Sequence, residues 1–276
     1  MTDVLLAPPA TGRAPGALGG ALLVVEYHWK WYRRNWRSTA VSSVLQPLLF
    51  LLAFGVGFGA LVAGSGRAAE ATGGVDYLVW LAPALLAVSA VQTGVFDSTY
   101  PVLSGFKWQR HYLAMTASPV SPAQVVAGHL CWLSARTAGS GAIYVAVIAV
   151  FGGIRSPGIV LSLLAAVLAG AAVAAPVTAF TAGVEDEGSA FNVLFRLVLI
   201  PMTLFSGTFF PVANLPAAVR PVTWVSPLWH GTELARAAVL GTGPPLAALG
   251  HVAYLLVLVV AGAAVAVRRF RRRLYR

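Results

Sequence analysis

Residues 96–122, FDSTYPVLSGFKWQRHYLAMTASPVSP, decide how the chain is organised, because this polar, aromatic stretch separates two of its most hydrophobic segments. The 276-residue sequence is 58% hydrophobic and only 10% charged, with a mean hydropathy of +0.78. Such a composition lies outside the range of soluble domains. We therefore predict an integral membrane protein in which residues 96–122 leave the membrane.

The hydrophobic segments flanking this stretch are roughly as long as a bilayer core is thick, about 20 residues each, and they lack the alternation typical of a membrane β-barrel. The fold class we predict is all-α and polytopic, with 20–276 forming a single transmembrane domain. The predicted spans are 39–63, 78–98, 124–150, 158–181, 191–212 and 246–267. The tail 1–19 is rich in Pro and Gly and lacks the pattern of a signal peptide, so we expect it to be disordered and cytoplasmic.

Lysine and arginine set the expected orientation, because positive residues near helix ends are retained on the cytoplasmic side. We expect a bacterial plasma membrane with both termini on its cytoplasmic side. In that orientation 13 of these residues fall in cytoplasmic segments and 4 in outer loops. The outer four are Arg67, Arg155, Arg220 and Arg236. The C-terminal RRFRRRLYR directly follows a span, which favours anchoring to lipid headgroups over nucleic-acid binding.

The segment 20–37 carries two parallel helical stripes. Leu22, Val25, Trp29, Tyr32 and Trp36 form an apolar stripe with spacings of 3 and 4 residues. The same spacing one position later gives the charged stripe Glu26, Lys30, Arg33 and Arg37. We predict an amphipathic helix in the membrane interface that leads into the first span, rather than a simple overhang of that span.

The stretch 96–122 is predicted to contain a short helix facing the cytoplasm. Val102, Phe106 and Leu113 are expected on one side and Lys107 and His111 on another, with Ser118-Pro119 and Ser121-Pro122 ending the helix. Two interpretations remain open at this point. The helix either lies in the interface, with Trp108 and Tyr112 at the headgroup level, or docks a cytoplasmic subunit.

Residues 96–128, FDSTYPVLSGFKWQRHYLAMTASPVSPAQVVAG, resemble the segment that permeases of type-2 ATP-binding-cassette exporters place between their second and third spans. Residues 201–241 are similar to the family's fifth span ending in Ser-Gly-x-x-Phe-Pro, followed by a Leu-Pro turn, Pro-Leu-x-His and an acidic residue before arginine. The subgroup it looks most like is the nodulation-factor and daunorubicin-type export permeases. The resemblance implies that 100–115 is a coupling helix seated in a groove of an ATPase subunit. The residues it assigns to that helix are Tyr100, Val102, Leu103, Phe106, Lys107, Trp108, Arg110, His111 and Leu113.

ATP hydrolysis is expected on another chain. A phosphate-binding loop needs Gly-x-x-x-x-Gly-Lys-Ser/Thr, whereas the two lysines here, Lys30 and Lys107, are each followed by Trp. We therefore expect no cofactor on this chain, and ATP with Mg on the partner. By analogy with the family, two ATPase subunits would serve two permeases, either identical or sister chains, surrounded by membrane lipids.

The outer region 205–245 is too hydrophobic for a solvated loop, and its prolines interrupt any single span. We predict re-entrant half-helices bordering the exit of the transport path, since broken backbone at membrane depth must face protein or a water-filled cavity. The resemblance likewise places the outer gate there. The candidate gate residues are Phe205, Phe209, Phe210, Trp224, Trp229, His230, Glu233 and Arg236.

Within this region His230, Glu233 and Arg236 recur at intervals of three on one helical face. An ion pair between Glu233 and Arg236 is favoured over a metal site at His230 and Glu233, which lacks an evident third ligand. The outer aromatic side chains could stack on a cargo molecule or form an interface belt.

Arg136 and Arg196 fall inside predicted spans, where an unpaired charge costs at least about 2.5 kcal/mol. Either both line an inner vestibule and meet anionic headgroups, or each has a structural partner. The nearest acidic cluster is the turn Glu185-Asp186-Glu187, which could contact the ATPase or only solvate the turn. Cys131, the single cysteine, is expected in the core.

We therefore expect a transport subunit for a lipophilic or amphipathic cargo such as a drug, a lipid-linked molecule or a glycolipid, with catalytic and metal sites absent from this chain. Two alternatives belong to other classes. An intramembrane lipid-modifying enzyme would need a nucleophile and a base, for which Ser206 or Ser226 with His230 is the best pair. A passive channel would conduct without any ATPase.

Overall fold

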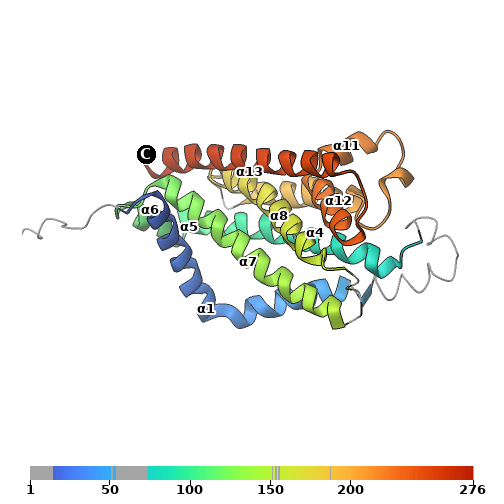
Figure 1. Ribbon diagram of the computed structural model, residues 1–276. Coiled ribbons are helices and arrows are strands. Elements are labelled where there is room, and N and C mark those ends of the chain that lie inside the picture. Colours follow the sequence, from blue (N-terminus) through green and yellow to red (C-terminus); the bar gives the residue numbers. More distant parts are fainter. Residues whose placement is uncertain are drawn as a thin grey trace, which may run out of the picture.

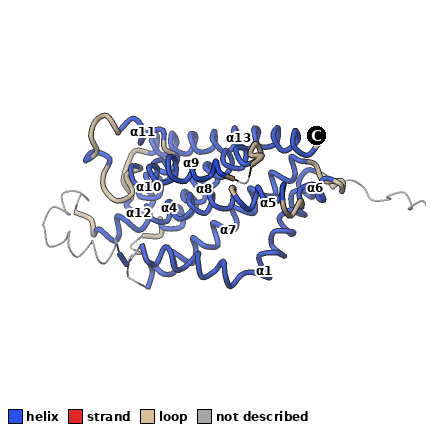
Figure 2. The backbone as a smooth tube through the Cα atoms, turned by 180° about the vertical axis from the view of Figure 1, so that it is seen from behind, coloured by secondary structure: helices blue, strands red, loops and turns tan. Residues whose placement is uncertain are grey.

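The structure is a computed structural model that describes residues 15–50, 52–53, 74–150, 152, 154, 156–186 and 188–275. Every regular element in this part of the chain is helical, and no strand occurs there (Figure 2). Among the described residues, four helices are long and apolar enough to cross a membrane: α4 (Tyr77–Ser98), α7 (Pro122–Val150), α8 (Ile159–Thr181) and α13 (Pro245–Leu274). They run side by side along the long axis of the molecule (Figure 1).

Helix α8 occupies the centre of the bundle and packs against α4, α7, α12 and α13. Small residues allow its backbone to approach its neighbours closely. A Cβ placed on Gly94 of α4 would lie 2.6 Å from the carbonyl oxygen of Gly170 in α8, and one on Gly262 of α13 would lie 2.6 Å from the nitrogen of Pro176. Such contacts are typical of helix packing in membranes, where apolar burial alone does not hold helices together.

Helix α1 (Ala17–Phe50) is continuous where we predicted an interfacial helix followed by a separate span. Figure 1 shows it bending: its first part crosses the direction of the long helices steeply, and its later part turns alongside them. Residues 17–19, expected to be disordered, belong to this helix, and Gln124 of α7 donates to the carbonyl of Gly16 at 3.1 Å just before it. Residues 1–14 lie outside the described residues, as do residues 51 and 54–63 of the predicted first span, 39–63.

The predicted span 191–212 ends earlier than expected. The helical segment consists of α9 (Ser189–Val193), the π-helical turn η2 (Leu194–Leu199) and α10 (Ile200–Phe205). Pro201 lacks an N–H and its ring crowds the preceding turn, which accounts for the wider π-turn directly before it. The segment stops at Phe205 because the backbone turns at Gly207, which has φ +70°.

The remaining elements gather at the two ends of the bundle (Figure 1). One end, which we call the α6 end, holds α5 (Tyr100–Lys107), α6 (His111–Thr116), the beginning of α1 and the C-terminus. The opposite α12 end holds η3 (Val212–Asn214), α11 (Arg220–Val225) and α12 (Pro227–Leu240). The two sequence motifs on which the family resemblance rests, in residues 96–128 and 201–241, thus lie at opposite ends of one bundle.

Candidate functional site

The predicted coupling helix is two short helices, because α5 ends at Lys107 and α6 begins at His111. Arg110 between them adopts a left-handed conformation, φ 52°, and the N–H of Gln109 returns to the carbonyl of Ser104 at 2.8 Å. This geometry turns the chain and ends α5. The expectation that Val102, Phe106 and Leu113 share one side of a single helix is therefore wrong.

One side of the α5–α6 pair is packed into the bundle. Val102 and Tyr112 are buried in a cluster with Val24 of α1 and Phe270 of α13. The Phe106 ring contacts two of these rings, with its centroid 4.9 Å from that of Tyr112 and 4.6 Å from that of Phe270. Leu103 is buried in a separate cluster with Phe191. These residues hold the pair in place, and the fully buried Val102, Leu103 and Tyr112 cannot contact another protein.

The other side of the pair is free. Trp108 is 52% exposed, and Gln109, Arg110 and Leu113 are exposed beside it. Tyr100 is exposed at the start of α5, its ring edge-on to Phe191. Aromatic and arginine side chains are enriched in protein interfaces and also at the level of lipid headgroups, so both interpretations of this surface stay open. We call Trp108, Gln109, Arg110 and Leu113 the turn surface.

Three histidines meet behind this surface: His28 of α1, His111 of α6 and His129 of α7. The ring centroid of His28 lies 5.4 Å from that of His129 and 6.5 Å from that of His111. Burial lowers the pKa of His28 and of His111 to about 4. Sequence reasoning placed His111 here but missed the other two, which are 83 and 18 residues away along the chain and had no motif around them.

The C-terminal arginines do more than meet headgroups. Arg269 donates to the carbonyl of Ala179 at 3.0 Å, and Arg273 to those of Thr181 and Ala182 at 3.3 Å, which caps the last turn of α8. The guanidinium of Arg273 also lies 4.4 Å from the centre of the Phe106 ring. Arg268, Arg271 and Arg272 are exposed. Arg273 therefore supports α5 from behind, and Arg269 caps α8 beside it.

The amphipathic part of α1 uses a third face for packing. Gly20, Ala21 and Val24 are buried against α7, and a Cβ on Gly128 of α7 would lie 2.5 Å from the carbonyl oxygen of Ala21. The side chains of the two predicted stripes are exposed apart from the half-buried Val25 and Tyr32; the exposed ones are Leu22, Glu26, Trp29, Lys30, Arg33, Trp36 and Arg37. Glu26 and Lys30 form an ion pair at 2.7 Å. Exposed leucine and tryptophan beside charged residues suit a helix that lies against lipid.

Arg136 is paired, but not with the acidic turn. Its partner is Asp97 at the end of α4, and the relative exposure of the two side chains is only 21% and 16%. Arg196 lies on the exposed surface of the turn η2 instead of joining Arg136. Asp186 accepts from the N–H of Gly188 at 2.8 Å and from the Ser189 hydroxyl, and these bonds lower the pKa of its carboxyl group. Glu185 is exposed, and Glu187 lies outside the described residues.

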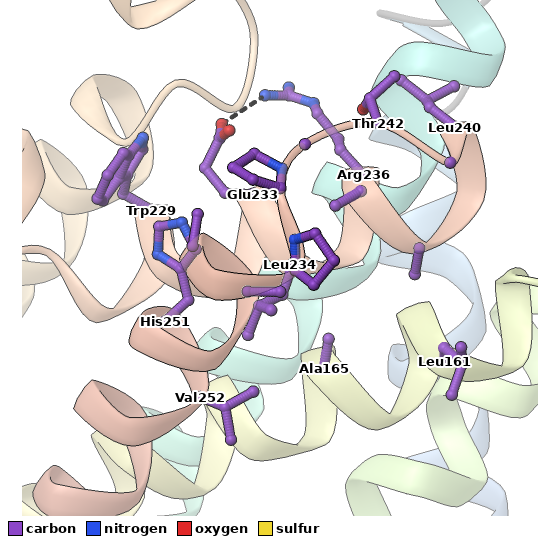
Figure 3. A pocket seen from close by; sticks show the side chains of 18 of the residues that line it. Leu161, Ala165, Trp229, Glu233, Leu234, Arg236, Leu240, Thr242, His251 and Val252 are labelled. Carbon is purple, nitrogen blue, oxygen red and sulfur yellow. Dashed lines mark ion pairs between the residues drawn. The ribbon is translucent and has the colours of Figure 1, made fainter.

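Arg236 organises the α12 end. Its guanidinium is buried and donates to the carbonyls of Trp80, Gly207 and Thr208 at 3.2, 2.7 and 2.8 Å. It also lies 3.4 Å from the centre of the Trp80 ring. The predicted ion pair with Glu233 is present at 3.7 Å (Figure 3). One side chain of α12 thereby holds α4 and the loop after α10 together.

The same loop receives further hydrogen bonds. Tyr77 donates to the carbonyl of Phe209 at 3.0 Å, Thr223 to that of Phe205 at 3.0 Å, and the hydroxyls of Ser206 and Ser226 are 2.6 Å apart. The backbone of the Ser-Gly-x-x-Phe-Pro motif, with the residue before it, is thus held by hydrogen bonds from side chains of α4, α11 and α12. Because Ser206 and Ser226 bond one another, neither forms the nucleophile–base pair with His230 that an enzyme would need.

His230 is occupied by other partners. Its Nε2 lies 2.9 Å from the carbonyl oxygen of Trp224 and its Nδ1 lies 2.7 Å from Nδ1 of His251 in α13. The Tyr254 ring stacks on it at 4.0 Å. No group of three His, Cys, Asp or Glu side chains that could hold a metal ion occurs in the described part of the chain. Phe205, Phe210 and Trp224 are exposed, whereas Phe209 and Trp229 are half-buried.

The chain is similar to known proteins over most of its length. The model of the family described as ABC-2 type transporter matches residues 21–240. The chain belongs to the ABC-2 type transporter family. It is 30% identical to Nodulation protein J of Rhizobium meliloti (strain 1021) over 257 residues, covering 89% of this chain and 94% of that protein. It is 28% identical to Nodulation protein J of Bradyrhizobium diazoefficiens over 258 residues, covering 91% and 95%.

The family match runs from the buried face of α1 to the last residue of α12, so it includes both ends of the bundle. Membership points to a multi-pass membrane protein that serves as a transport subunit rather than an enzyme, and it implies an ATPase partner. The side chains of this ABC-2 transporter that sequence reasoning missed are Tyr77, Asp97, His251 and Phe270, together with His28 and His129. Of these, only Asp97 could have been found from the sequence, because it is an acidic residue at the end of a predicted span.

The single cysteine corrects one further expectation. Cys131 is exposed on α7, not buried in the core. Its neighbours in the sequence, Leu130 and Trp132, are half-buried and buried, so the thiol points away from the bundle.

Proposed function

We propose that the chain is the permease subunit of an ATP-driven exporter in the bacterial plasma membrane, with six spans and both termini in the cytoplasm. The turn surface at the α6 end carries this proposal, because it combines an exposed Trp108 and an exposed Arg110 on a support that is firmly packed. Two such permeases, or one with a sister chain, would stand on two ATPase subunits that bind ATP and Mg.

Force applied to the turn surface would reach the bundle by two routes. Phe106 and Tyr112 contact Phe270 of α13, and His111 contacts Tyr27 of α1 with ring centroids 5.2 Å apart. Side chains packed this densely move together, so displacement of α5–α6 would displace α1 and α13. Re-entrant α11 and α12 would then open at the outer side, where Arg236 clamps the loop 206–211 to α4.

The cargo we propose is lipophilic or amphipathic. The spans are built largely from Ala, Gly, Val and Leu, and their close helix contacts leave little room for a hydrated path for a polar solute.

Reconstitution tests the function directly. The chain is co-purified with its partner ATPase subunit, placed in proteoliposomes, and assayed for ATP-dependent movement of a lipophilic fluorescent dye and of a dye-labelled phospholipid. We expect movement of at least one probe that stops when the lysine of the ATPase phosphate-binding loop is changed to alanine. Equal flux without the ATPase, or with that variant, would contradict the proposal and indicate a passive channel.

A further inference from the structure

A cavity of about 1050 Å³ lies between α8, α12 and α13 at the α12 end. Its volume is at the upper end of the range for sites that hold small molecules. Most of its wall is apolar and comes from all three helices. The aliphatic residues that form this wall include Leu161, Leu164, Ala165, Leu168, Leu234 and Val252.

The polar lining is confined to one side. Figure 3 shows Glu233 and Arg236 on one side of Leu234, and Leu161, Ala165 and Val252 on the other. His251 and Trp229 lie near the polar side. A molecule that fills this cavity must therefore be amphipathic, with a polar group at Glu233 and a hydrocarbon part against α8.

The polar atoms left to bond such a molecule are the hydrogen-bond acceptors of Glu233. Arg236 also lines the cavity, but its guanidinium is already bound to three carbonyls and stacked on Trp80. Glu233 is 3.7 Å from that guanidinium, which is longer than a hydrogen bond, and its side chain is 40% exposed. A carboxylate has about four acceptor positions, so Glu233 can still accept hydrogen bonds from a cationic group.

The rim of the cavity indicates where its occupant comes from. Leu161 and Leu164 of α8, which line the cavity, are 61% and 60% exposed, and Leu246 and Leu249 at the start of α13 are exposed as well. In a membrane these side chains face acyl chains, so the opening gives onto the bilayer rather than onto water. A bilayer lipid can reach Glu233 without crossing an aqueous phase.

We propose that this cavity binds one membrane phospholipid whose headgroup carries a primary ammonium. The ammonium donates to the carboxylate of Glu233, and an acyl chain lies along Leu161, Ala165 and Val252. A primary ammonium has three N–H donors, whereas the trimethylammonium of choline has none and an anionic headgroup repels the carboxylate. The lipid fills the gap between the half-helix α12 and the long helices α8 and α13. Because it binds only the folded arrangement of these helices, it stabilises that arrangement.

The test uses the full chain purified in mild detergent after incubation with vesicles of equal parts phosphatidylethanolamine, phosphatidylglycerol and phosphatidylcholine. Native mass spectrometry counts the lipids retained. We expect one phosphatidylethanolamine on the wild type, and at least a tenfold loss of this preference in Glu233→Gln. Glu26→Gln, which removes an exposed acid at the opposite end, is the matched control and should retain the wild-type pattern.

Two further variants separate binding from folding. Ala165→Trp fills the apolar side of the cavity and should abolish retention, and Leu161→Gln, at an exposed position where folding is not at stake, should weaken it. Thermal unfolding without lipid checks that each variant is folded. Retention of the three lipids without preference, or an unchanged preference in Glu233→Gln, would overturn the proposal. Neither result would bear on ATP-driven export, which is assayed separately.

Discussion

Two arginines illustrate how a buried charge is accommodated at the scale of single residues. Arg136 has one carboxylate partner, Asp97, whereas Arg236 relies mainly on three backbone carbonyls and an aromatic ring. The sequence was enough to predict that each needs partners. It identified Glu233, three residues away on the same helix, but not Asp97, because that pairing depends on how α4 and α7 pack across 39 residues of chain.

The pair between Asp97 and Arg136 gives a prediction at this scale. Asp97→Ala leaves a largely buried guanidinium without its counter-charge, so we expect unfolding to be easier by about 3–5 kcal/mol. In the double variant Asp97→Ala/Arg136→Met no charge remains, and most of the stability should return. The measurement is denaturant or thermal unfolding of the four proteins of this double-mutant cycle in detergent. Additive losses in the double variant would show that the two side chains do not depend on one another.

Helix elements differ in how far sequence could describe them. The long apolar segments predicted the bounds of α4, α7 and α8 to within two residues, because the length of an apolar segment can be read directly from the sequence. The break between α5 and α6 was missed, since the left-handed position is held by Arg110 and not by the glycine or asparagine that usually marks one. The packing face of α1 was also missed, because Gly20, Ala21 and Val24 do not stand out beside tryptophans.

The contact between α4 and α8 is tested with a matched pair of glycine variants. Gly94→Ala places a methyl group 2.6 Å from a backbone oxygen of α8, so the helices must separate, at a cost of about 1–3 kcal/mol. Gly139→Ala of α7 meets no atom within 4 Å and should be neutral or slightly stabilising. Thermal unfolding compares the two. Equal midpoints would show that close approach of α4 and α8 contributes little.

The histidines that join α1 to α6 predict a pH dependence. Their pKa values are about 4 in the folded protein and about 6.5 when unfolded, so below pH 6.5 the unfolded chain binds more protons. Stability should therefore fall between about pH 6.5 and pH 4, on the order of 2 kcal/mol for His28. We expect the midpoint of thermal unfolding to drop over this range, and to drop less in His28→Gln. A variant curve parallel to the wild-type curve would exclude this origin.

The whole molecule has two specialised ends joined by one tightly packed bundle. The C-terminus, α5, α6 and the beginning of α1 meet at one end, and the motif-bearing loop after α10 meets α11 and α12 at the other (Figure 1). The basic residues Lys107, Arg110 and Arg268–Arg273 gather at the first end, in keeping with the charge asymmetry on which the predicted orientation rests. The sequence predicted that the bundle has two different ends, because the hydropathy and charge of long segments can be read without knowing the fold. The Arg236 clamp and the cavity required the folded arrangement.

Site-specific cross-linking tests the central claim, that the turn surface docks on the ATPase subunit. Trp108→Cys is made in a Cys131→Ser background, since Cys131 is itself exposed, and the matched control is Ala213→Cys, exposed at the α12 end. Both are treated with a short thiol-to-amine cross-linker, which joins the new cysteine to lysines of the partner, in the assembled complex. We predict a permease–ATPase product from position 108 and none from position 213. An intact complex that cross-links from position 213, or that fails to cross-link from position 108, would contradict the account.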